Sequence, residues 1–539
     1  MAVPPPALVT DLLAGAVAQW PDRVALDFIG RSMTYAALDA AVGRVAAGLQ
    51  ALGLASGDRV CLCLPNSPYY VIAYFAVLRA GGIVVGTNPL YTAREIGHLV
   101  ADSGAKIAFV IDLPAVHAKV AAVASIAHII SCPMAAALPT LKGLAYRALR
   151  RGDILDRRAA DARTTPFRHL ERTPNTPLSV SRTPDDVAVL QYTGGTTGLP
   201  KGAMLTHAGL VANCLQVAAH DSTRTAGPET VMAVLPLFHV FALTSAFHDA
   251  IQTGARIVLL PRFEMASFLA AMKRTRPHRL YVVPTILIAL NALPETKLPS
   301  TAALRLCVSG GAPLPPEVRS RFEARTGARV VEGYGLTEAS PTVTCNPVDA
   351  QPRDGSAGVA MPGTTIIIRS LETGEPLAIG ETGEVCVSGP QLMKGYWNRP
   401  AETAEVLVDG LLRTGDVGYL DADGYLFLVD RIKDLILCGG YNVYPRVIED
   451  ALYEHEAVAE AVVIGVPDDY RGEAPKAFVV LRPGETASPA ELRGFLSTRI
   501  SKIELPREIE IRDTLPRTLI GKLSKKGKRG LRAALPVWP

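Results

Sequence analysis

The sequence lacks the features that mark several large classes of protein. Its net charge is only +4 over 539 residues, which is too small a bias for bulk nucleic-acid binding. None of its eight cysteines belongs to a C-x-x-C pair, so neither a zinc site nor a disulfide framework is indicated. The first residues, Met-Ala-Val-Pro-Pro-Pro, have no basic segment and no apolar core of the kind found in a signal peptide. We therefore expect a cytoplasmic protein that binds no nucleic acid.

A membrane-spanning helix is also not expected. Residues 120–141 carry no formal charge and are numerous enough to cross a bilayer. The stretch is rich in alanine, however, and Pro133 and Pro139 interrupt it. Residues 126–131 are better explained as a buried parallel strand followed by a loop. Cys61 and Cys63 alternate on another predicted strand and are interpreted as small core residues.

The length of the chain predicts at least two domains, because a single core stops growing well below 539 residues. Helix-like and strand-like stretches alternate over the first two thirds, which is typical of βαβ units and mainly parallel sheets. The helices are expected at residues 34–52 and 69–79, and the strands at residues 60–64, 83–85 and 107–111.

The texture of the sequence changes after residue 357. Short strands separated by glycine turns, such as 365–369 and 383–388, indicate a small antiparallel subdomain. Beyond Asp434 an α/β alternation returns over about a hundred residues. The predicted fold class is α/β, with a large N-terminal domain (1–432) of mixed and parallel sheets plus this subdomain. A small α+β domain (433–539) follows.

The most informative stretch reads Tyr-Thr-Gly-Gly-Thr-Thr-Gly-Leu-Pro-Lys-Gly-Ala-Met, at residues 192–204. Its glycines free the backbone to curl, and its threonine hydroxyls and one ammonium add donors, which suits the wrapping of a polyphosphate. The residues concerned are Thr193, Gly194, Gly195, Thr196, Thr197, Gly198, Lys201 and Gly202. The spacing is not that of the Walker A loop, in which the lysine precedes Ser or Thr. A flexible surface loop is the alternative interpretation.

Other motifs combine glycine, aromatic and charged residues in ways that suit a nucleotide. Tyr334 lies between two glycines and could stack on a purine, and Glu338 could hold Mg²⁺ near a triphosphate. Asp416, in Thr-Gly-Asp, suits the hydroxyls of a ribose. Four charges cluster at 430–434, and Lys522 follows a glycine near the C-terminus. Each motif alone has a structural alternative: a turn, an Asx-turn residue, an exposed linker or a surface lysine.

One segment is basic. Residues 142–172 hold nine Lys or Arg against four Asp or Glu. A solvated surface excursion explains the composition, and a peripheral contact with an anionic membrane is the alternative, because a basic amphipathic stretch can lie on such a surface.

Taken together, the motifs resemble those of the acyl- and aryl-CoA synthetases of the adenylate-forming superfamily, which also includes firefly luciferase and peptide-synthetase adenylation domains. The resemblance covers about 12–529, and within the superfamily the chain looks most like bacterial long-chain fatty-acid CoA ligases. The matching motifs are YTGGTTGLPKG, LPLFHVFAL, SGGAP, GYGLTE, VSGPQ, GYWNRP, TGD, DRIKD, GGYNVYP and PRTLIGK.

The resemblance implies a reaction in two steps. A carboxylate attacks the α-phosphorus of ATP to give an acyl adenylate and pyrophosphate, and coenzyme A then displaces AMP. ATP, Mg²⁺ and coenzyme A are the implied cofactors. The carboxylic acid is expected to be a fatty acid, and homodimerisation is left open.

The resemblance also implies roles for individual residues. Lys522, Lys201, Glu338 and His239 would be catalytic, with Glu338 also the metal ligand and His239 bordering the acyl tunnel together with Phe241. A core aromatic strand is the alternative for this last pair. The residues implied to bind nucleotide or coenzyme A are Thr193, Gly194, Gly195, Thr196, Thr197, Gly198, Lys201, Gly311, Ala312, Pro313, Gly333, Tyr334, Gly335, Thr337, Asp416, Arg431, Gly439, Gly440 and Tyr441.

In the resembling family the small C-terminal domain rotates about a hinge, which maps to Lys433. Rotation would withdraw Lys522 after the first step and bring the 439–441 loop toward the acyl adenylate. A charged residue suits a hinge because it stays solvated in both orientations.

Three alternatives remain at this point. The chain could be an acyl-AMP ligase that loads a carrier protein, although the insertion common in such enzymes is not evident between Val387 and Lys433. It could be a CoA ligase for dicarboxylic or aromatic acids. A catalytically silent nucleotide-binding scaffold is disfavoured, because the chain has all four of Lys201, Glu338, Asp416 and Lys522.

Overall fold

The computed structural model describes residues 7–156, 160–193, 200–224, 228–438, 441–468, 470–517, 523 and 525. The chain folds into two compact units. One comprises Met1–Thr365 and Ser388–Gly410, and the other comprises Ile366–Val387 and Leu411–Pro539.

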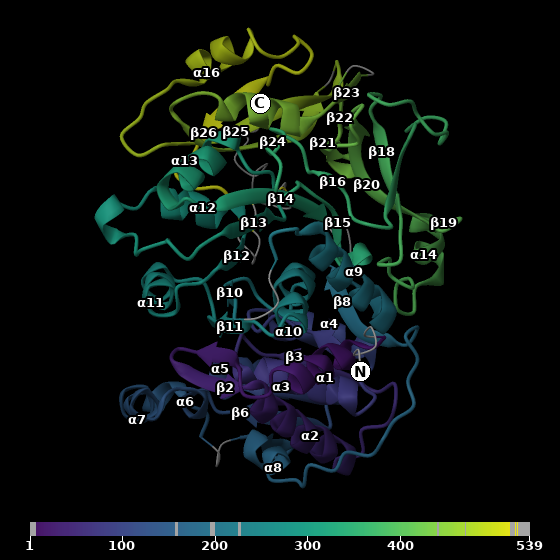
Figure 1. Cartoon of the computed structure of the whole chain (residues 1–539). Coiled ribbons are helices and arrows are strands. Elements are labelled where there is room, and N and C mark those ends of the chain that lie inside the picture. The colour runs from purple at the N-terminus through teal and green to yellow at the C-terminus, as the bar shows by residue number, and fades with distance from the viewer. Residues whose placement is uncertain are drawn as a thin grey trace. The chain divides into compact units, whose positions relative to one another are not determined.

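The first sheet of the larger unit has seven strands in the order β7-β6-β5-β3-β4-β8-β9 (Figure 1). The strands pair in parallel except at β9, which runs antiparallel to β8. Their bounds are β3 (Arg59–Cys63), β4 (Ile83–Gly86), β5 (Ile107–Ile111), β6 (His128–Cys132), β7 (Thr164–Pro166), β8 (Val187–Thr193) and β9 (Lys201–Thr206). The parallel sheet and its first strands confirm the βαβ interpretation of the sequence.

The second sheet of the larger unit has nine strands in the order β16-β15-β14-β13-β12-β10-β11-β1-β2. Strands β1 and β10 to β14 form its parallel part, and the strands at both ends are antiparallel to their neighbours. The bounds are β1 (Val24–Phe28), β2 (Arg31–Thr34), β10 (Thr230–Ala233), β11 (Arg256–Leu259), β12 (Arg279–Val282), β13 (Leu306–Gly310), β14 (Arg329–Gly335), β15 (Thr342–Cys345) and β16 (Val359–Ala360).

Helices cover these two sheets. Of the two helices expected from the sequence, α3 (Pro68–Arg79) is the more deeply buried. Every residue from Tyr69 to Leu78 is buried, so this helix lies inside the core and not on the surface. The Tyr70 hydroxyl donates to the carbonyl oxygen of Leu237 at 3.0 Å, and Asn66 Nδ2 donates to that of Leu235 at 2.8 Å. These bonds join the entry of α3 to the segment that follows β10.

Side-chain caps begin several helices of this unit. Thr34 caps α2 (Tyr35–Ala51) by accepting from the Ala37 N–H, and Thr92 with Glu95 forms a capping box on α4 (Ala93–Ser103). The remaining helices of this unit are α1 (Val9–Gln19), α5 (Pro114–Ala121), α6 (Met134–Ala137), α7 (Thr140–Leu149), α8 (Phe167–Glu171), α9 (His207–His220), α10 (Asp249–Gln252), α11 (Met265–Thr275), α12 (Pro284–Asn291), α13 (Pro316–Thr326) and α14 (Pro400–Val406). Short 3-10 turns are η1 (Arg151–Asp153), η3 (Glu295–Lys297) and η4 (Thr337–Ala339), and η2 (Phe241–His248) is a π-helix.

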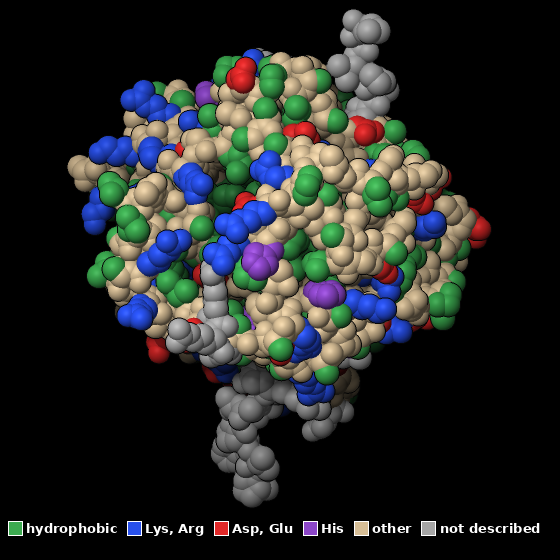
Figure 2. Space-filling view, turned by 90° about the horizontal axis from the view of Figure 1, so that it is seen from below, with side chains coloured by type: hydrophobic (Ala, Val, Ile, Leu, Met, Phe, Trp, Pro, Cys, Tyr) green, Lys and Arg blue, Asp and Glu red, His purple; other side chains and the backbone are tan. Residues whose placement is uncertain are grey.

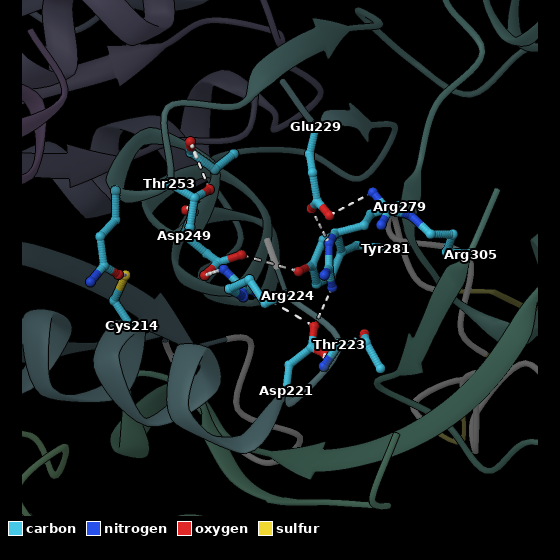
Figure 3. Close-up of polar contacts among 12 residues, drawn as sticks. Cys214, Asp221, Thr223, Arg224, Glu229, Asp249, Thr253, Arg279, Tyr281 and Arg305 are labelled. Atoms are coloured by element: carbon cyan, nitrogen blue, oxygen red, sulfur yellow. Dashed lines mark hydrogen bonds and ion pairs between the residues drawn. The ribbon is translucent and has the colours of Figure 1, made fainter. Parts of the chain in front are cut away.

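A buried network of charges holds the nine-stranded sheet at the starts of β10 and β12 (Figure 3). The guanidinium of Arg279 pairs with Asp221 and Glu229, and Arg305 pairs with Glu229 at 2.8 Å. Burial opposes the ionisation of Asp221, but Arg279 and a hydroxyl hydrogen bond outweigh it and lower the pKa of this carboxyl. Because parallel strands begin at this edge, the network lies at the end of the sheet opposite to the strand carboxyl ends.

The smaller unit contains two further sheets. The first is antiparallel and includes β17 (Thr365–Arg369), β18 (Gly383–Ser388), β20 (Leu411–Leu420) and β21 (Leu426–Arg431). The short strand β19 (Leu407–Val408) belongs to the larger unit. The second has the order β23-β22-β25-β24 with β26 paired to β25, and its strands are β22 (Ile436–Cys438), β23 (Tyr441–Val443), β24 (Val458–Asp468), β25 (Gly472–Leu481) and β26 (Glu508–Ile511). Helices α15 (Pro445–Tyr453) and α16 (Pro489–Leu496) pack on it, and η5 (Ile432–Asp434) precedes it. The predicted antiparallel subdomain and the α+β region after it are therefore confirmed.

The structure describes the uncharged stretch of residues 120–141 and the strand that carries the two alternating cysteines. None of the helices that the structure describes could span a bilayer. The expected strand at 126–131 forms as β6, which begins two residues later and ends one residue later than expected. The backbone N–H groups of Ala127 and His128 both donate to the Lys106 carbonyl where the ladder begins. Cys61 and Cys63 are buried in the core, where burial raises the pKa of the Cys61 thiol to about 11.

Candidate active site

The Gly/Thr-rich motif spans the β8–β9 hairpin. Thr193 and Lys201 are directly opposite each other in the antiparallel register, so the hairpin brings both ends of the motif together. A side chain at Gly202 would be crowded, because a Cβ there would lie 3.1 Å from the ring of Tyr192. The turn itself, with Gly194, Gly195, Thr196, Thr197 and Gly198, lies outside the described residues.

Lys201 and Glu338 come together on the two sides of one tyrosine. The Tyr396 hydroxyl donates to Glu338 Oε1 at 2.7 Å, and the Lys201 ammonium lies 5.1 Å from the centre of the Tyr396 ring. Tyr396 is only 8% exposed, and burial together with the Glu338 carboxylate raises the pKa of its hydroxyl. The hydroxyl therefore stays protonated and can keep donating to the carboxylate.

Backbone hydrogen bonds fix this arrangement. Met393 N–H donates to the Glu338 carbonyl at 2.7 Å, and Trp397 N–H donates to the Gly202 carbonyl at 2.8 Å. Between them, Met204 and the 394–395 segment exchange two bonds of 2.9 Å. The strand that carries Lys201 and the turn that carries Glu338 are thus joined to the same short segment, 393–397.

A carboxylate on α4 supports the hairpin from the other side. Asp102 accepts from the Tyr192 hydroxyl at 2.8 Å and pairs with Arg399 at 3.0 Å. Its backbone carbonyl accepts from the Trp397 indole N–H at 3.2 Å. Because the Asp102 side chain is only 8% exposed, these contacts fix the end of β8 against residues 397–399.

The other predicted nucleotide-binding residues lie at the carboxyl ends of neighbouring parallel strands. Gly310, which ends β13, pairs in register with Gly333 of β14. Gly311, Ala312 and Pro313 follow directly after β13, while Tyr334 and Gly335 end β14. In open α/β sheets the crevice outside the strand carboxyl ends is where ligands bind.

Close backbone packing explains the glycine after Tyr334. A Cβ on Gly335 would come within 2.2 Å of the Pro341 carbonyl oxygen, so no side chain fits there. Gly311 has φ of +83°, a left-handed conformation that favours glycine. Thr337 and Glu338 follow in the 3-10 turn η4, which places the carboxylate next to the end of β14.

His239 and Phe241 lie at the carboxyl end of β10, but not on a strand. The alternative interpretation of this stretch as a core aromatic strand is wrong, because η2 begins at Phe241 as a π-helix. A Cβ on Gly310 would meet the Phe241 ring at 3.1 Å, and the Phe241 N–H donates to His239 Nδ1 at 3.4 Å. Both residues therefore share the edge of the sheet that carries Gly311 and Tyr334. Single-turn π geometry within helices is frequent at functional sites.

The site residues of the smaller unit are partly paired with one another. Asp416 and Arg431 face each other across β20 and β21, with Arg431 Nε 2.8 Å from Asp416 Oδ1. The Asp416 carboxylate is buried and the guanidinium half-exposed, at 7% and 48%. Lys433 is exposed in η5, and Tyr441 is 66% exposed at the start of β23. Gly439, Gly440 and Lys522 lie outside the described residues.

A magnesium ion fits the donors that this site offers. Among the described residues no group of three or more His, Cys, Asp or Glu side chains could hold a metal. Mg²⁺ commonly uses one or two carboxylates and completes its shell with water and substrate phosphate oxygens. Glu338, with one oxygen held by Tyr396, supplies a single oriented carboxylate of that kind.

Sequence reasoning missed Tyr396 and Asp102 as parts of the site. Tyr396 lies in GYWNRP, which carried part of the resemblance, so a signal existed but not a role. Asp102 lies on the amphipathic helix α4 with no motif around it, and only its contacts identify it.

A hairpin that carries Lys201, an oriented carboxylate and glycine-rich turns at strand carboxyl ends suit a nucleotide-dependent enzyme that works on phosphate groups. Similarity to known protein families identifies the kind of enzyme. The profile of the AMP-binding enzyme family matches residues 13–397, and that of the AMP-binding enzyme C-terminal domain matches residues 447–522. The chain belongs to the AMP-binding enzyme family.

Individual relatives cover nearly the whole chain. A long-chain-fatty-acid–CoA ligase of Bacillus subtilis is 42% identical over 96% of this chain and 93% of its own. The ATP-bound structure of MatB from Rhodopseudomonas palustris is 31% identical, with a TM-score of 0.82 over 97% of this chain and 99% of the other. The anthranilate CoA ligase AuaEII in complex with anthranoyl-AMP is 26% identical, with a TM-score of 0.85 over 98% of both chains.

Proposed function

We propose that the chain ligates a long-chain fatty acid to coenzyme A. It is an AMP-forming acyl-CoA ligase, an acid–thiol ligase that uses ATP and coenzyme A and passes through an acyl adenylate. The fatty acid is the proposed part. It rests on the 42% identity with the ligase of Bacillus subtilis over almost the full length of both chains.

The contact that best supports the adenylation chemistry is the Lys201–Tyr396–Glu338 arrangement. An acyl carboxylate and a triphosphate are both anions, so the first step needs positive charge around the phosphates. We assign Lys201 and the residues 193–198 to the β- and γ-phosphates. Tyr396 acts as a positioning residue, because its ring faces the Lys201 ammonium and its hydroxyl orients the Glu338 carboxylate.

Glu338 is the proposed metal ligand. When bound there, Mg²⁺ would screen the phosphate charge that opposes the approach of the carboxylate. The Tyr396 hydroxyl occupies one carboxylate oxygen of Glu338 and sets the direction of the other. Since the hydroxyl is held protonated by burial, this orientation does not change over the physiological pH range.

Residues at the strand ends are assigned to the nucleoside. Tyr334 would stack on adenine, between Gly333 and Gly335, while residues 311–313 line the same edge. Thr337 would contact the phosphates. Asp416 is assigned to the ribose hydroxyls, with Arg431 holding its carboxylate at 2.8 Å.

The C-terminal residues are assigned to the exchange between the two steps. Lys522 would bridge the attacking carboxylate and the α-phosphate during adenylation. A rotation hinged at Lys433 would then replace it with the loop of residues 439–441 at the thiol entry. The exposure of Lys433 supports this assignment, because a hinge residue must stay solvated in each orientation. The predicted domain boundary between 432 and 433 depends on the same rotation.

His239 and Phe241 are assigned to the border of the acyl-binding region. The support is their position beside Gly310, at the edge of the sheet that carries the residues assigned to adenine. A carboxylate attacking the α-phosphorus must approach from a region adjacent to the nucleotide.

Acid specificity is the experiment that tests the proposal. Purified protein is supplied with ATP, Mg²⁺ and coenzyme A, and AMP release is measured for medium-chain and long-chain fatty acids, dicarboxylic acids and aromatic acids. The proposal predicts the highest kcat/KM for long-chain fatty acids. Preference for an aromatic acid, as the name of AuaEII indicates for that relative, would assign the chain to another branch of CoA ligases. Acyl transfer to a carrier protein but not to free coenzyme A would identify an acyl-AMP ligase.

We also propose that the protein works in the cytoplasm and contacts the membrane surface through its basic segment, residues 142–172. Long-chain fatty acids partition into bilayers, so an enzyme that collects them gains from contact with the lipid. The charge of the segment, nine basic against four acidic residues, suits anionic headgroups.

A further inference from the structure

Helix α7 presents an apolar face that none of the described residues of its own compact unit covers. The helix packs through the side on which Gly143 lies, since a Cβ at that glycine would meet the Ala135 carbonyl oxygen at 2.4 Å. Lys142 Nζ adds a bond of 3.1 Å to the Ile29 carbonyl, and Arg31 donates to the carbonyl of Ala136 in α6. The helix is therefore fixed in place by one side, and the opposite side faces outward.

The outward side is apolar at helical spacing. At about 100° per residue, positions 141, 144, 145, 148 and 149 lie around the direction opposite to Gly143. They are occupied by leucine and alanine: Leu141, Leu144, Ala145, Ala148 and Leu149. The three leucines are 81%, 56% and 83% exposed. A helix of a globular protein usually turns such a stripe toward the core. The apolar stripe of α7 instead faces outward.

Basic side chains border this stripe. At 100° per residue Lys142 and Arg147 lie on the two flanks of the stripe, and Arg151 follows directly after the helix. Arg150 lies on the side of Gly143 and pairs with Asp153 at 3.2 Å. Figure 2 shows Lys and Arg side chains interspersed with hydrophobic ones over the left part of the face seen from below, the side on which Figure 1 draws α7.

We propose that α7 is the element that docks this protein on an anionic lipid surface. The leucines enter the boundary between headgroups and acyl chains, and the basic residues contact lipid phosphates. An apolar stripe bordered by Lys and Arg is the pattern of helices that lie in the plane of a membrane interface. The inference rests on the membrane contact proposed above and does not depend on the ligase chemistry.

The positive charge around the stripe favours an anionic lipid surface over a second copy of the chain as its partner. A two-fold contact through α7 would place the same surface against itself. The basic residues that border the stripe would then face their own copies, and like charges across an interface are repulsive. An anionic bilayer instead offers the opposite charge over the whole face, while its acyl region accepts the leucines.

Vesicle binding tests the proposal. Full-length protein is sedimented with vesicles of phosphatidylcholine alone or mixed equally with phosphatidylglycerol. The variants are Leu141→Gln with Leu144→Gln and Leu149→Gln, and separately Arg147→Gln with Arg151→Gln. The matched control is Ile379→Gln, since Ile379 is also an exposed apolar residue, at 68%, but belongs to the other compact unit.

The expected results follow from the two contributions to membrane binding, insertion of the leucines and attraction between basic residues and anionic headgroups. Wild type and Ile379→Gln bind the mixed vesicles equally, and binding weakens as salt is raised. The triple leucine variant loses about 100-fold or more in partitioning, since burying even half of each leucine contributes severalfold to tenfold. The double arginine variant loses about fivefold per charge, and only on the anionic vesicles. All variants keep the wild-type rate of AMP release with a water-soluble acid and the same melting temperature.

Each contrary result has a distinct meaning. If wild type binds the mixed vesicles but the leucine variant binds them equally well, α7 is not the docking element, and the membrane contact proposed for residues 142–172 must lie elsewhere. If wild type binds neither vesicle, both proposals fail while the ligase assignment stands. If the leucine substitutions instead convert a dimer to a monomer in solution, α7 is an interface between copies and the lipid proposal is wrong.

Discussion

Removing one oxygen atom from Tyr396 tests the arrangement that we place at the centre of the adenylation site. Tyr396→Phe keeps the ring beside Lys201 but deletes the hydroxyl that donates to Glu338 at 2.7 Å. A hydrogen bond to a charged partner contributes about 1.5–3 kcal/mol. Glu338 is only partly buried, so water can replace part of the lost bond, and the lower end of that range applies. The expected loss is about tenfold in kcat/KM for adenylation, at 1.4 kcal/mol per tenfold.

The loss should appear in the adenylation half-reaction and in its dependence on the Mg²⁺ concentration. Acid-dependent pyrophosphate release is measured against Mg²⁺ at fixed ATP, and thioester formation is measured separately from preformed acyl adenylate. Tyr396→Phe should require more Mg²⁺ for half-maximal pyrophosphate release, while thioester formation stays near the wild-type rate. Direct titration of Mg²⁺ in the presence of ATP provides a readout that does not depend on turnover.

Comparison with Tyr396→Leu separates the hydroxyl from the ring. The leucine variant also loses the aromatic face beside the Lys201 ammonium, a contact that contributes about 0.5–2 kcal/mol. It should therefore lose a further factor of about two to thirty, mainly through weaker ATP binding. If Tyr396→Phe matches the wild type in both rate and Mg²⁺ dependence, the hydroxyl does not position Glu338 and our reasoning is wrong.

The remaining predictions concern the proposed rotation between the two half-reactions and the stability of the fold. Lys522→Ala should lower pyrophosphate release by on the order of 10²-fold or more yet spare thioester formation, and Lys433→Pro should do the reverse; equal losses in both half-reactions would refute these roles. Arg279→Met should lower the free energy of unfolding by about 3 kcal/mol, the low end for a broken buried pair, because Asp221 and Glu229 lose their buried guanidinium while Arg224 and Arg305 still pair with them; urea denaturation measures this. Burial lowers the pKa of His207 to about 4 and of His248 to about 3, so unfolding takes up protons below pH 6.5. The free energy of unfolding should therefore fall by about 2–3 kcal/mol per pH unit between pH 6 and 4, whereas a flat profile would show that these histidines are not buried and neutral.

Much of the framework could be predicted from local signals. The helix expected at 34–52 forms as α2, which Thr34 caps, and the short apolar runs predicted β3, β4 and β5. These features depend on residues close in sequence, where backbone preferences and periodicity act directly.

The contacts that assemble the site could not be predicted in this way. Tyr396 and Glu338 are 58 positions apart and Asp102 and Arg399 are 297 apart, and no periodicity relates them. The π-helix that begins at Phe241 was equally hidden, since an aromatic and apolar run fits a buried strand or a buried helix. Contacts between segments far apart in the chain, rather than local preference, bring these groups together.

The central claim is that positive groups converge on ATP to activate a carboxylate before coenzyme A takes part. The most direct measurement is the identity and timing of the products when acid and ATP are mixed first and coenzyme A is added later. We predict pyrophosphate and enzyme-bound acyl adenylate before the addition, followed by AMP and acyl-CoA in equal amounts after it. Release of ADP and inorganic phosphate, or no product until coenzyme A is present, would contradict the account.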